Sequence, residues 1–298
     1  MNPPPCSGEA PSGARPLGPS LSFMQLNFRR SETTWVLCQQ ELLEKGASPD
    51  IILVQDPPTS VLGGKNIFQG YRIVKAPGRG QGLGQVAIVF RNSLRVRGLR
   101  PFGPRVVLAE LAGTEGPIIV ISAYIRYSSG EGLADLEAAL RWAKGRCPRV
   151  LLGLDGNGHS PWWGPPTVAT NPVGSLLEDF IVDHDLEVLN DCHSPPSFVS
   201  DMGDRTWIDI TLATRSTALS VFDWRVESEF FAGSDHRPIC FTLDSIPLHT
   251  EAFKRRAWEQ ADWGAFAASV AQGCQAAGLL GAPDPDSRIT GDAPSIAN

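Results

Sequence analysis

The stretch Val150-Leu-Leu-Gly-Leu-Asp155-Gly-Asn157 is an apolar run that ends in two polar side chains. A short apolar run bounded by glycine is typical of a strand buried on both faces. Strand ends are where α/β proteins place functional groups, because a rigid sheet directs several of them at one target. We expect Asp155 and Asn157 to alternate along an extended chain and to point the same way, with Gly156 allowing close backbone approach. A plain turn at a strand end has the same pattern, so this pair alone defines no function.

Polar side chains adjoin several other apolar runs. Asn27, Asp56 and Tyr124 each close a run, and Ser234-Asp235-His236 lies directly before another. Each of these also fits an ordinary polar loop. Together they supply what metal-dependent cleavage of a phosphodiester needs, since carboxylates hold a hard divalent cation, an amide orients a water and an imidazole interacts with charge on the phosphate.

One carboxylate falls inside an apolar run. Asp209 lies within the stretch 208–213, where its neighbours are isoleucines. A buried carboxylate needs a partner to offset its desolvation. We expect a histidine, because a carboxylate fixes the tautomer of an imidazole and supports its cationic form.

The chain of 298 residues reads as one large domain with tails. Residues 1–20 are rich in Pro, Gly and Ser and are expected to be disordered. The patterning predicts strands at 21–28, 51–55, 71–76, 86–90, 94–99, 105–111, 117–124, 150–154, 187–189, 207–213, 222–229 and 238–243, and helices at 31–45, 132–145 and 171–184. Strand-rich halves separated by helices favour an α/β fold, a four-layer α/β/β/α sandwich of two mostly antiparallel sheets covering residues 21–245. Residues 246–298 are expected to form a helical or disordered linker, with a helix pair at 251–280.

The charge is unevenly distributed. The net charge is −6, yet no carboxylate occurs between Asp56 and Glu110, and that segment carries nine cations: Lys65, Arg72, Lys75, Arg79, Arg91, Arg95, Arg97, Arg100 and Arg105. The rest of the chain is therefore near −15, which is −6 minus 9. A polyanion docked on one face and a solvated set of Arg-rich hairpins both fit this segment.

The remaining bulk features bear on location. The six cysteines are widely scattered without metal-finger spacing, which indicates an intracellular, reducing compartment. The Pro-rich start has no apolar region typical of a signal peptide, and the apolar runs are far shorter than a membrane span, so we expect no membrane association.

The order of these residues along the chain resembles the exonuclease–endonuclease–phosphatase superfamily, which includes the apurinic endonucleases. The resemblance covers about residues 21–245. Within that superfamily the sequence is most similar to the endonuclease domain of non-LTR (LINE-type) retrotransposons. The stretches that carry this likeness are 25–27 with Arg30, 55–57, 155–160 with Trp163-Gly164, and 206–213.

The resemblance implies a role for each residue. Asn27, Asp56 and Asp235 would lie at the metal end, with Asp56 as the main ligand of Mg²⁺ or Mn²⁺. Asp155 would position or deprotonate the attacking water. The other catalytic residues would be Tyr124 at the scissile phosphate, Asn157 orienting water and phosphate, and His236, braced by Asp209, at the phosphoryl oxygen. The residues expected to contact or support DNA are Arg30, Arg79, Arg126, Arg205 and Ser234.

The resemblance also implies a function. It is nicking of one strand of double-stranded DNA to leave a 3′-hydroxyl that primes reverse transcription. The partners would be the target DNA, a reverse transcriptase domain of the same polyprotein and, indirectly, the element RNA, with the protein acting in the nucleus.

Two alternatives stay open: a weakly active or inactive DNA-binding module, and a relative that acts on another phosphoester. The family normally has Glu where this chain has Asp56, and Asp is shorter by about 1.5 Å, one carbon–carbon bond. Mg²⁺ tolerates little deviation from its oxygen distances.

Three local features complete the sequence evidence. Residues 195–207 are expected to form a hairpin turning at 201–204, which in the resembling family reaches into a DNA groove. The glycine-rich run 77–84 lacks the residues of a phosphate-binding loop and reads as a surface loop. His159, Trp162 and Trp163 are expected to be structural.

Overall fold

The computed structural model describes residues 20–62, 68–78, 84–113, 116–230, 233–244 and 263–276. Contacts divide the chain into two units, residues 1–252 and 253–298. Residues 1–19 of the expected N-terminal tail, Lys65, and Arg79 with most of the glycine-rich run lie outside the described residues.

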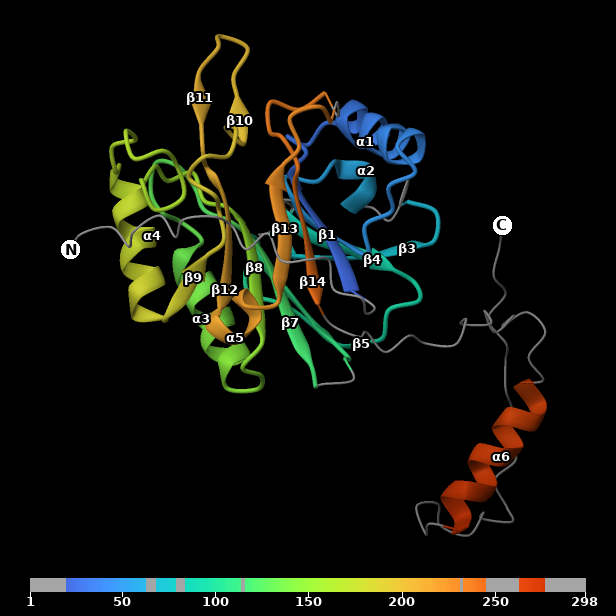
Figure 1. Ribbon diagram of the computed structural model, residues 1–298. Coiled ribbons are helices and arrows are strands. Elements are labelled where there is room, and N and C mark those ends of the chain that lie inside the picture. Colours follow the sequence, from blue (N-terminus) through green and yellow to red (C-terminus); the bar gives the residue numbers. More distant parts are fainter. Residues whose placement is uncertain are drawn as a thin grey trace. The chain divides into compact units, whose positions relative to one another are not determined.

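Two six-stranded sheets form the body of the first unit (Figure 1). The first sheet has the order β13 (Val221–Val226), β14 (Ile239–Asp244), β1 (Ser20–Asn27), β2 (Ile51–Gln55), β4 (Val86–Arg91) and β3 (Tyr71–Lys75). The second has the order β5 (Val96–Pro101), β6 (Val106–Leu111), β7 (Ile118–Tyr124), β8 (Val150–Asp155), β12 (Asp209–Thr214) and β9 (Leu186–Val188). β10 (Phe198–Val199) and β11 (Arg205–Thr206) form a separate hairpin.

Each sheet contains one parallel pair near its centre. β1 pairs with β2 and β7 pairs with β8, whereas the other pairs are antiparallel. In register, Asn27 lies opposite Gln55, and Tyr124 lies opposite Asp155. Because parallel strands end at the same edge, polar residues at or just after their last positions gather there. The sheets thus bring together the residues that the sequence placed at strand ends.

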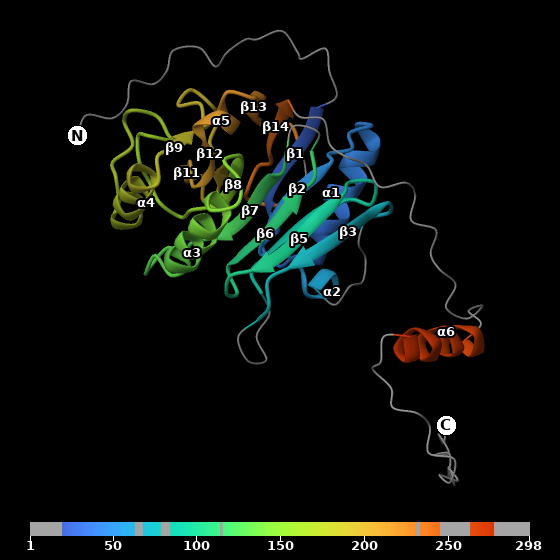
Figure 2. The ribbon, with the colours of Figure 1, turned by 90° about the horizontal axis from the view of Figure 1, so that it is seen from below.

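The core has three layers. Apolar side chains between the sheets form the central one, with Phe23 stacked on Phe241 as an example. On the outer side of the first sheet, α1 (Glu32–Glu44) buries Trp35 and Cys38. On the outer side of the second sheet pack α3 (Leu133–Lys144) and α4 (Pro172–Asp183), as Figures 1 and 2 show. The predicted four-layer sandwich is therefore confirmed.

Local chemistry explains the helix boundaries. The Ser31 side chain accepts a hydrogen bond from the Thr34 amide and begins α1, and Gly46 follows its end at a φ of +59°. Asn171 caps α4 in the same way, with Pro172 at the first helical position. These caps match the sequence expectation.

The structure departs from the predicted elements in a few places. The first residue of β5 is Val96 rather than residue 94, and two short helices, α2 (Thr59–Leu62) and α5 (Arg215–Ala218), were not predicted. Four residues carry too little periodic signal to identify a helix. Within the expected helix pair at 251–280, the described residues form a single helix, α6 (Trp263–Ala276). None of the described helices is long and apolar enough to cross a membrane.

Candidate active site

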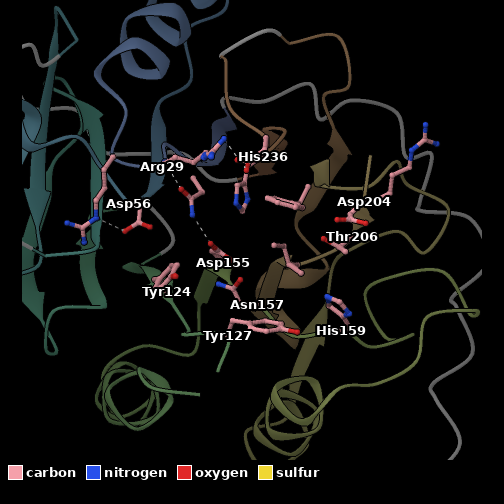
Figure 3. A pocket seen from close by; sticks show the side chains of 16 residues that line it. Arg29, Asp56, Tyr124, Tyr127, Asp155, Asn157, His159, Asp204, Thr206 and His236 are labelled. Atoms are coloured by element: carbon pink, nitrogen blue, oxygen red, sulfur yellow. Dashed lines mark hydrogen bonds and ion pairs between the residues drawn. The ribbon is translucent and has the colours of Figure 1, made fainter. Parts of the chain in front are cut away.

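A pocket of about 790 Å³ opens where the parallel strands of both sheets end (Figure 3). Nine of the residues predicted for the site line it: Asn27, Arg30, Asp56, Tyr124, Asp155, Asn157, Arg205, Asp235 and His236. A single pocket thus gathers residues from positions 27 to 236 of the chain.

Buried amides join the two sheets beneath this pocket. The Asn27 Nδ2 donates to Asp155 Oδ2 at 2.7 Å, and the Gln25 Nε2 donates to the Leu154 carbonyl at 2.9 Å. Gly153 leaves space for the side chains of Gln25 and Leu53. A Cβ at this position would lie 2.7 Å from Gln25 Oε1 and 2.5 Å from Leu53 Cδ1. The packing of the sheets therefore fixes the position of Asp155 relative to Asn27.

His236 and Asp209 form a buried pair. The His236 Nδ1 lies 2.9 Å from Asp209 Oδ2. The Ser234 Oγ accepts from the His236 amide and donates to the Asn27 carbonyl at 2.9 Å, so Ser234 supports the loop but does not line the pocket. Burial lowers the pKa of His236, but the charge and hydrogen bond of Asp209, together with Asp155 and Asp235, outweigh it and raise the pKa to about 9. The imidazole is therefore cationic at neutral pH.

Asp155 is almost completely buried at the end of β8. Burial raises its pKa, the positive charge of His236 opposes this, and the net pKa is about 7. Its Oδ1 is buried without a hydrogen-bond partner among the described residues. Burial, with Asp155 and Asp56 nearby, also raises the pKa of Tyr124 to about 12, so its phenol stays a donor. The pocket thus holds a carboxyl group that exchanges a proton near neutrality beside a fixed O–H donor.

Two consecutive arginines pair with the two carboxylates assigned to the metal. The Arg30 Nε lies 3.4 Å from Asp56 Oδ1, and the Arg29 Nη1 lies 3.2 Å from Asp235 Oδ2. Both arginines and Asp56 have positive φ angles, of 51°, 57° and 39°. Burial raises the pKa of Asp56, and Arg30 partly offsets this. The backbone after β1 and β2 is therefore bent sharply to hold these pairs.

The donor set fits a hard divalent cation. Carboxylate oxygens, which Mg²⁺ and Mn²⁺ prefer, come from Asp56, Asp155 and Asp235, and Asp235 Oδ1 is buried without a partner within the described part of the chain. Ligand atoms of Asp155, Asp209 and His236 also lie within 4.8 Å of one another. Since Asp209 is engaged with His236, Asp56 and Asp235 are the pocket carboxylates that could hold a divalent cation, with Asn27 also lining the pocket.

Three details of the predicted site are corrected. Asn157 has a φ of +50°, so it does not continue an extended strand as expected. It still lines the pocket and donates to the Ile125 carbonyl at 3.0 Å. His159 lines the pocket rather than being structural, whereas Trp163 is buried as expected. Arg126 is absent from the lining and pairs with Glu131 at 3.5 Å.

Ser234 supports the site through hydrogen bonds, as expected, because its Oγ bridges the Asn27 carbonyl and the His236 amide.

The sequence did not identify several lining residues, which are Arg29, Tyr127, Phe198, Asp204, Thr206 and Ile208. Arg29 adjoins Arg30 and could have been proposed from that position alone. Phe198, Asp204 and Thr206 belong to the β10–β11 hairpin or its turn, and their place depends on how that hairpin folds over the strand ends, which periodicity does not encode.

The basic segment is not part of the pocket. None of its described cations lines the site. Arg105 is buried against Glu131 at 2.7 Å, Arg91 pairs with Asp50, and the Arg72 guanidinium lies over the Phe90 ring. The segment therefore does not supply a cationic wall around the candidate active site.

Comparisons with known proteins agree with the fold. The family model described as endonuclease–reverse transcriptase matches residues 118–240. The endonuclease domain of TRAS1, a telomere-specific non-LTR retrotransposon, is 24% identical and has a TM-score of 0.64, covering 77% of this chain and 99% of that chain. An apurinic endonuclease from Leishmania major is 14% identical with a TM-score of 0.60, covering 75% and 87%. The catalytic domain of Xenopus laevis APE2 is 17% identical with a TM-score of 0.59, covering 78% and 94%. A comparison with curated proteins gave no match.

The chain shares the fold of these nucleases. Its resemblance to the endonuclease domain of non-LTR retrotransposons, inferred from the motifs, is confirmed by the family match and the fold.

Proposed function

We propose that this domain is a divalent-metal-dependent endonuclease that nicks one strand of duplex DNA and leaves a 3′-hydroxyl. One arrangement carries the proposal. A single pocket holds the Asn27–Asp155 hydrogen bond, the carboxylates of Asp56 and Asp235, and His236, which is paired with the buried Asp209. Nuclease relatives and the endonuclease–reverse transcriptase match support it.

Each side chain has a task in phosphodiester hydrolysis. Asp155, with a pKa of about 7, accepts a proton from the attacking water, and Asn27 orients its carboxylate. The water oxygen bonds to phosphorus as the bond to the 3′-oxygen breaks, and that oxygen takes a proton from solvent water to become the 3′-hydroxyl, while the proton on Asp155 returns to solvent. His236 donates from Nε2 to a phosphoryl oxygen, because its Nδ1 is engaged with Asp209. Tyr124 supplies a further O–H donor.

A bound Mg²⁺ or Mn²⁺ would supply charge neutralisation of the phosphate and the leaving oxygen. Asp56 and Asp235 would hold it. Arg30 and Arg205 line the pocket, and we assign them to the DNA backbone.

The biological setting follows from the same proposal. The 3′-hydroxyl would prime reverse transcription by a reverse transcriptase domain of the same polyprotein, copying the element RNA at the target. This role places the protein in the nucleus after its synthesis in the cytoplasm. Residues 246–298 would then act as the linker toward that domain.

Two features of Asp56 favour a second candidate, a DNA-binding module with little or no cleavage. Asp56 replaces the longer Glu of the resembling family, and its carboxylate already pairs with Arg30. Both features weaken the hold on a cation.

A plasmid-nicking assay with Mg²⁺, Mn²⁺ or EDTA separates the candidates. Metal-dependent nicking that is lost in Asp235→Ala and in His236→Ala supports the endonuclease. A gel shift of DNA without nicking under either metal supports the binding module. Hydrolysis of another phosphoester, such as an inositol phosphate, without any effect on DNA would contradict both.

A further inference from the structure

The basic segment found in the sequence has a surface of its own. Arg95, Arg97 and Arg100 lie on β5 or directly before it, and all three are exposed. Within the described residues they have no carboxylate partner, unlike Arg91 and Arg105 earlier and later in the segment. β5 is an edge strand that pairs with β6 alone. These three charges therefore face solvent at the margin of the second sheet.

A fourth cation joins them from the end of α3. Arg146 contacts Glu110 at 3.7 Å, and Glu110 lies opposite Gly98 of β5 in the strand register. Arg146 thus lies beside β5, and α3, which ends at Lys144, packs against the neighbouring strand β6. Glu110 pairs with Arg146 and offsets part of its charge, so the unpaired charge of this surface comes mainly from Arg95, Arg97 and Arg100. We call Arg95, Arg97, Arg100 and Arg146 the β5 arginine patch.

Aromatic rings order part of this patch. The Arg100 guanidinium lies 5.2 Å from the centre of the Trp142 ring and 5.2 Å from that of Phe102, and Arg146 lies 4.6 Å from Trp142. A guanidinium held over a ring loses less freedom when it binds an anion, and it keeps its N–H donors available. Arg100 and Arg146 are therefore preorganised, whereas Arg95 and Arg97 contribute exposed charge.

We propose that the β5 arginine patch binds single-stranded nucleic acid, separately from the pocket at the strand ends. Cations of this kind recognise the phosphate backbone, and guanidinium–aromatic surfaces also stack on unpaired bases. In duplex DNA the base faces are stacked inside the helix and cannot contact the patch. A single strand can therefore contact the arginines with its phosphates and the guanidinium–aromatic surface with its bases. The protein as a whole has a net charge of −6, so a polyanion is attracted to this patch rather than to the surface in general.

The test compares two matched double variants of the full chain in EDTA, so that the result does not depend on cleavage. Arg97→Gln with Arg100→Gln removes two charges from the patch. Arg215→Gln with Arg225→Gln removes two exposed charges at α5 and at β13, the far edge strand of the other sheet. Fluorescence anisotropy measures binding of a labelled mixed-sequence single-stranded oligonucleotide and of its duplex, and thermal unfolding checks each variant.

We expect the patch variant to bind the single strand about tenfold more weakly than wild type, with the slope of log K against log salt reduced by about 1.4, two phosphate contacts at about 0.7 each. The control variant should match wild type, and duplex binding should change little in either. Equal single-strand affinity in the two variants, or an equal loss for single strand and duplex, would overturn the proposal. Arg95→Gln alone provides an independent variant, with a smaller loss expected.

Discussion

Asp209 holds His236 across the interface between the two sheets, with 2.9 Å between the carboxylate Oδ2 and the ring Nδ1. Asp209 is the first residue of β12 in the second sheet, whereas His236 precedes β14 in the first. The Asn27–Asp155 hydrogen bond crosses between the same sheets. The candidate active site therefore forms only when the sheets pack, and its electrostatics depend on that packing.

The first prediction concerns the charge of His236. Asp209→Asn should lower the pKa of His236 well below about 9, because it removes the nearest negative charge while burial continues to lower the pKa. NMR titration of the imidazole in the metal-free protein measures this directly. Asp191→Asn, at a partly exposed aspartate outside the pocket lining, is the matched control. An unchanged titration in Asp209→Asn would contradict the assigned pairing.

The same pair predicts a dependence of stability on pH. The pKa of His236 is raised in the folded protein from 6.5 to about 9. Its contribution to stability is thus fully present below about pH 6.5 and is lost as the pH rises through 9. Urea unfolding at pH 6 to 9.5 should show a smaller decline in Asp209→Asn than in wild type. Equal declines would mean that His236 does not determine this dependence.

The second prediction concerns Asp155 as the proton acceptor. Nicking by the wild type should rise through about pH 7 as this carboxyl group ionises. Asn27→Ala should move that midpoint to higher pH, because the Asn27 amide stabilises the ionised form. It should also slow nicking about 10²-fold or more, as expected when a group acting in general base catalysis is displaced. A slower reaction with the same midpoint would assign Asn27 to substrate positioning alone.

Much of this site could be predicted from the sequence, for a physical reason. Parallel strands end at one edge, so polar groups such as Asp155 that follow apolar runs meet there whatever the loops do. The burial of Asp209 inside an apolar run likewise required a partner, and a histidine was the expected one. Family resemblance then identified it as His236.

What the sequence did not reveal depends on backbone direction at single residues. Asn157 leaves the strand with a φ of +50°, and the expected alternation with Asp155 was therefore wrong, although both line the pocket. His159 lines the pocket because the chain turns back after β8. The basic segment carries positive charge, as its sequence indicates. Its described cations lie on or beside strands β3 to β6, and none of them lines the pocket.

The third prediction concerns competition for the metal ligands. The Arg30 guanidinium pairs with Asp56, so a cation must displace it to use that carboxylate. Arg30→Gln should therefore bind Mn²⁺ up to about fivefold more tightly than wild type, since a half-exposed ion pair of this kind contributes up to about 1 kcal/mol. The electron paramagnetic resonance signal of free Mn²⁺ measures the affinity without any turnover. Arg126→Gln removes an exposed arginine outside the pocket lining and should have no effect. Equal Mn²⁺ affinities in all three proteins would show that Arg30 does not compete.

The last prediction concerns the length of the side chain at position 56. Asp56 has a φ of +39°, a conformation that Asp and Asn tolerate better than longer side chains. Asp56→Glu should extend the carboxylate toward the cation and raise both Mn²⁺ affinity and nicking rate. It should lower the unfolding temperature by a few degrees, about 2–4 °C for each kcal/mol of backbone strain in a domain of this size.

Asp56→Asn is the control for this change, because it keeps the side-chain length and suits the same backbone conformation but removes the charge. It should lose Mn²⁺ affinity and nicking while keeping the stability of wild type or exceeding it, since the buried charge is gone. If Asp56→Glu nicks no faster than wild type at saturating metal, the bent backbone after β2 already places the shorter carboxylate correctly. The Arg30 pair would then be the remaining feature that weakens metal binding.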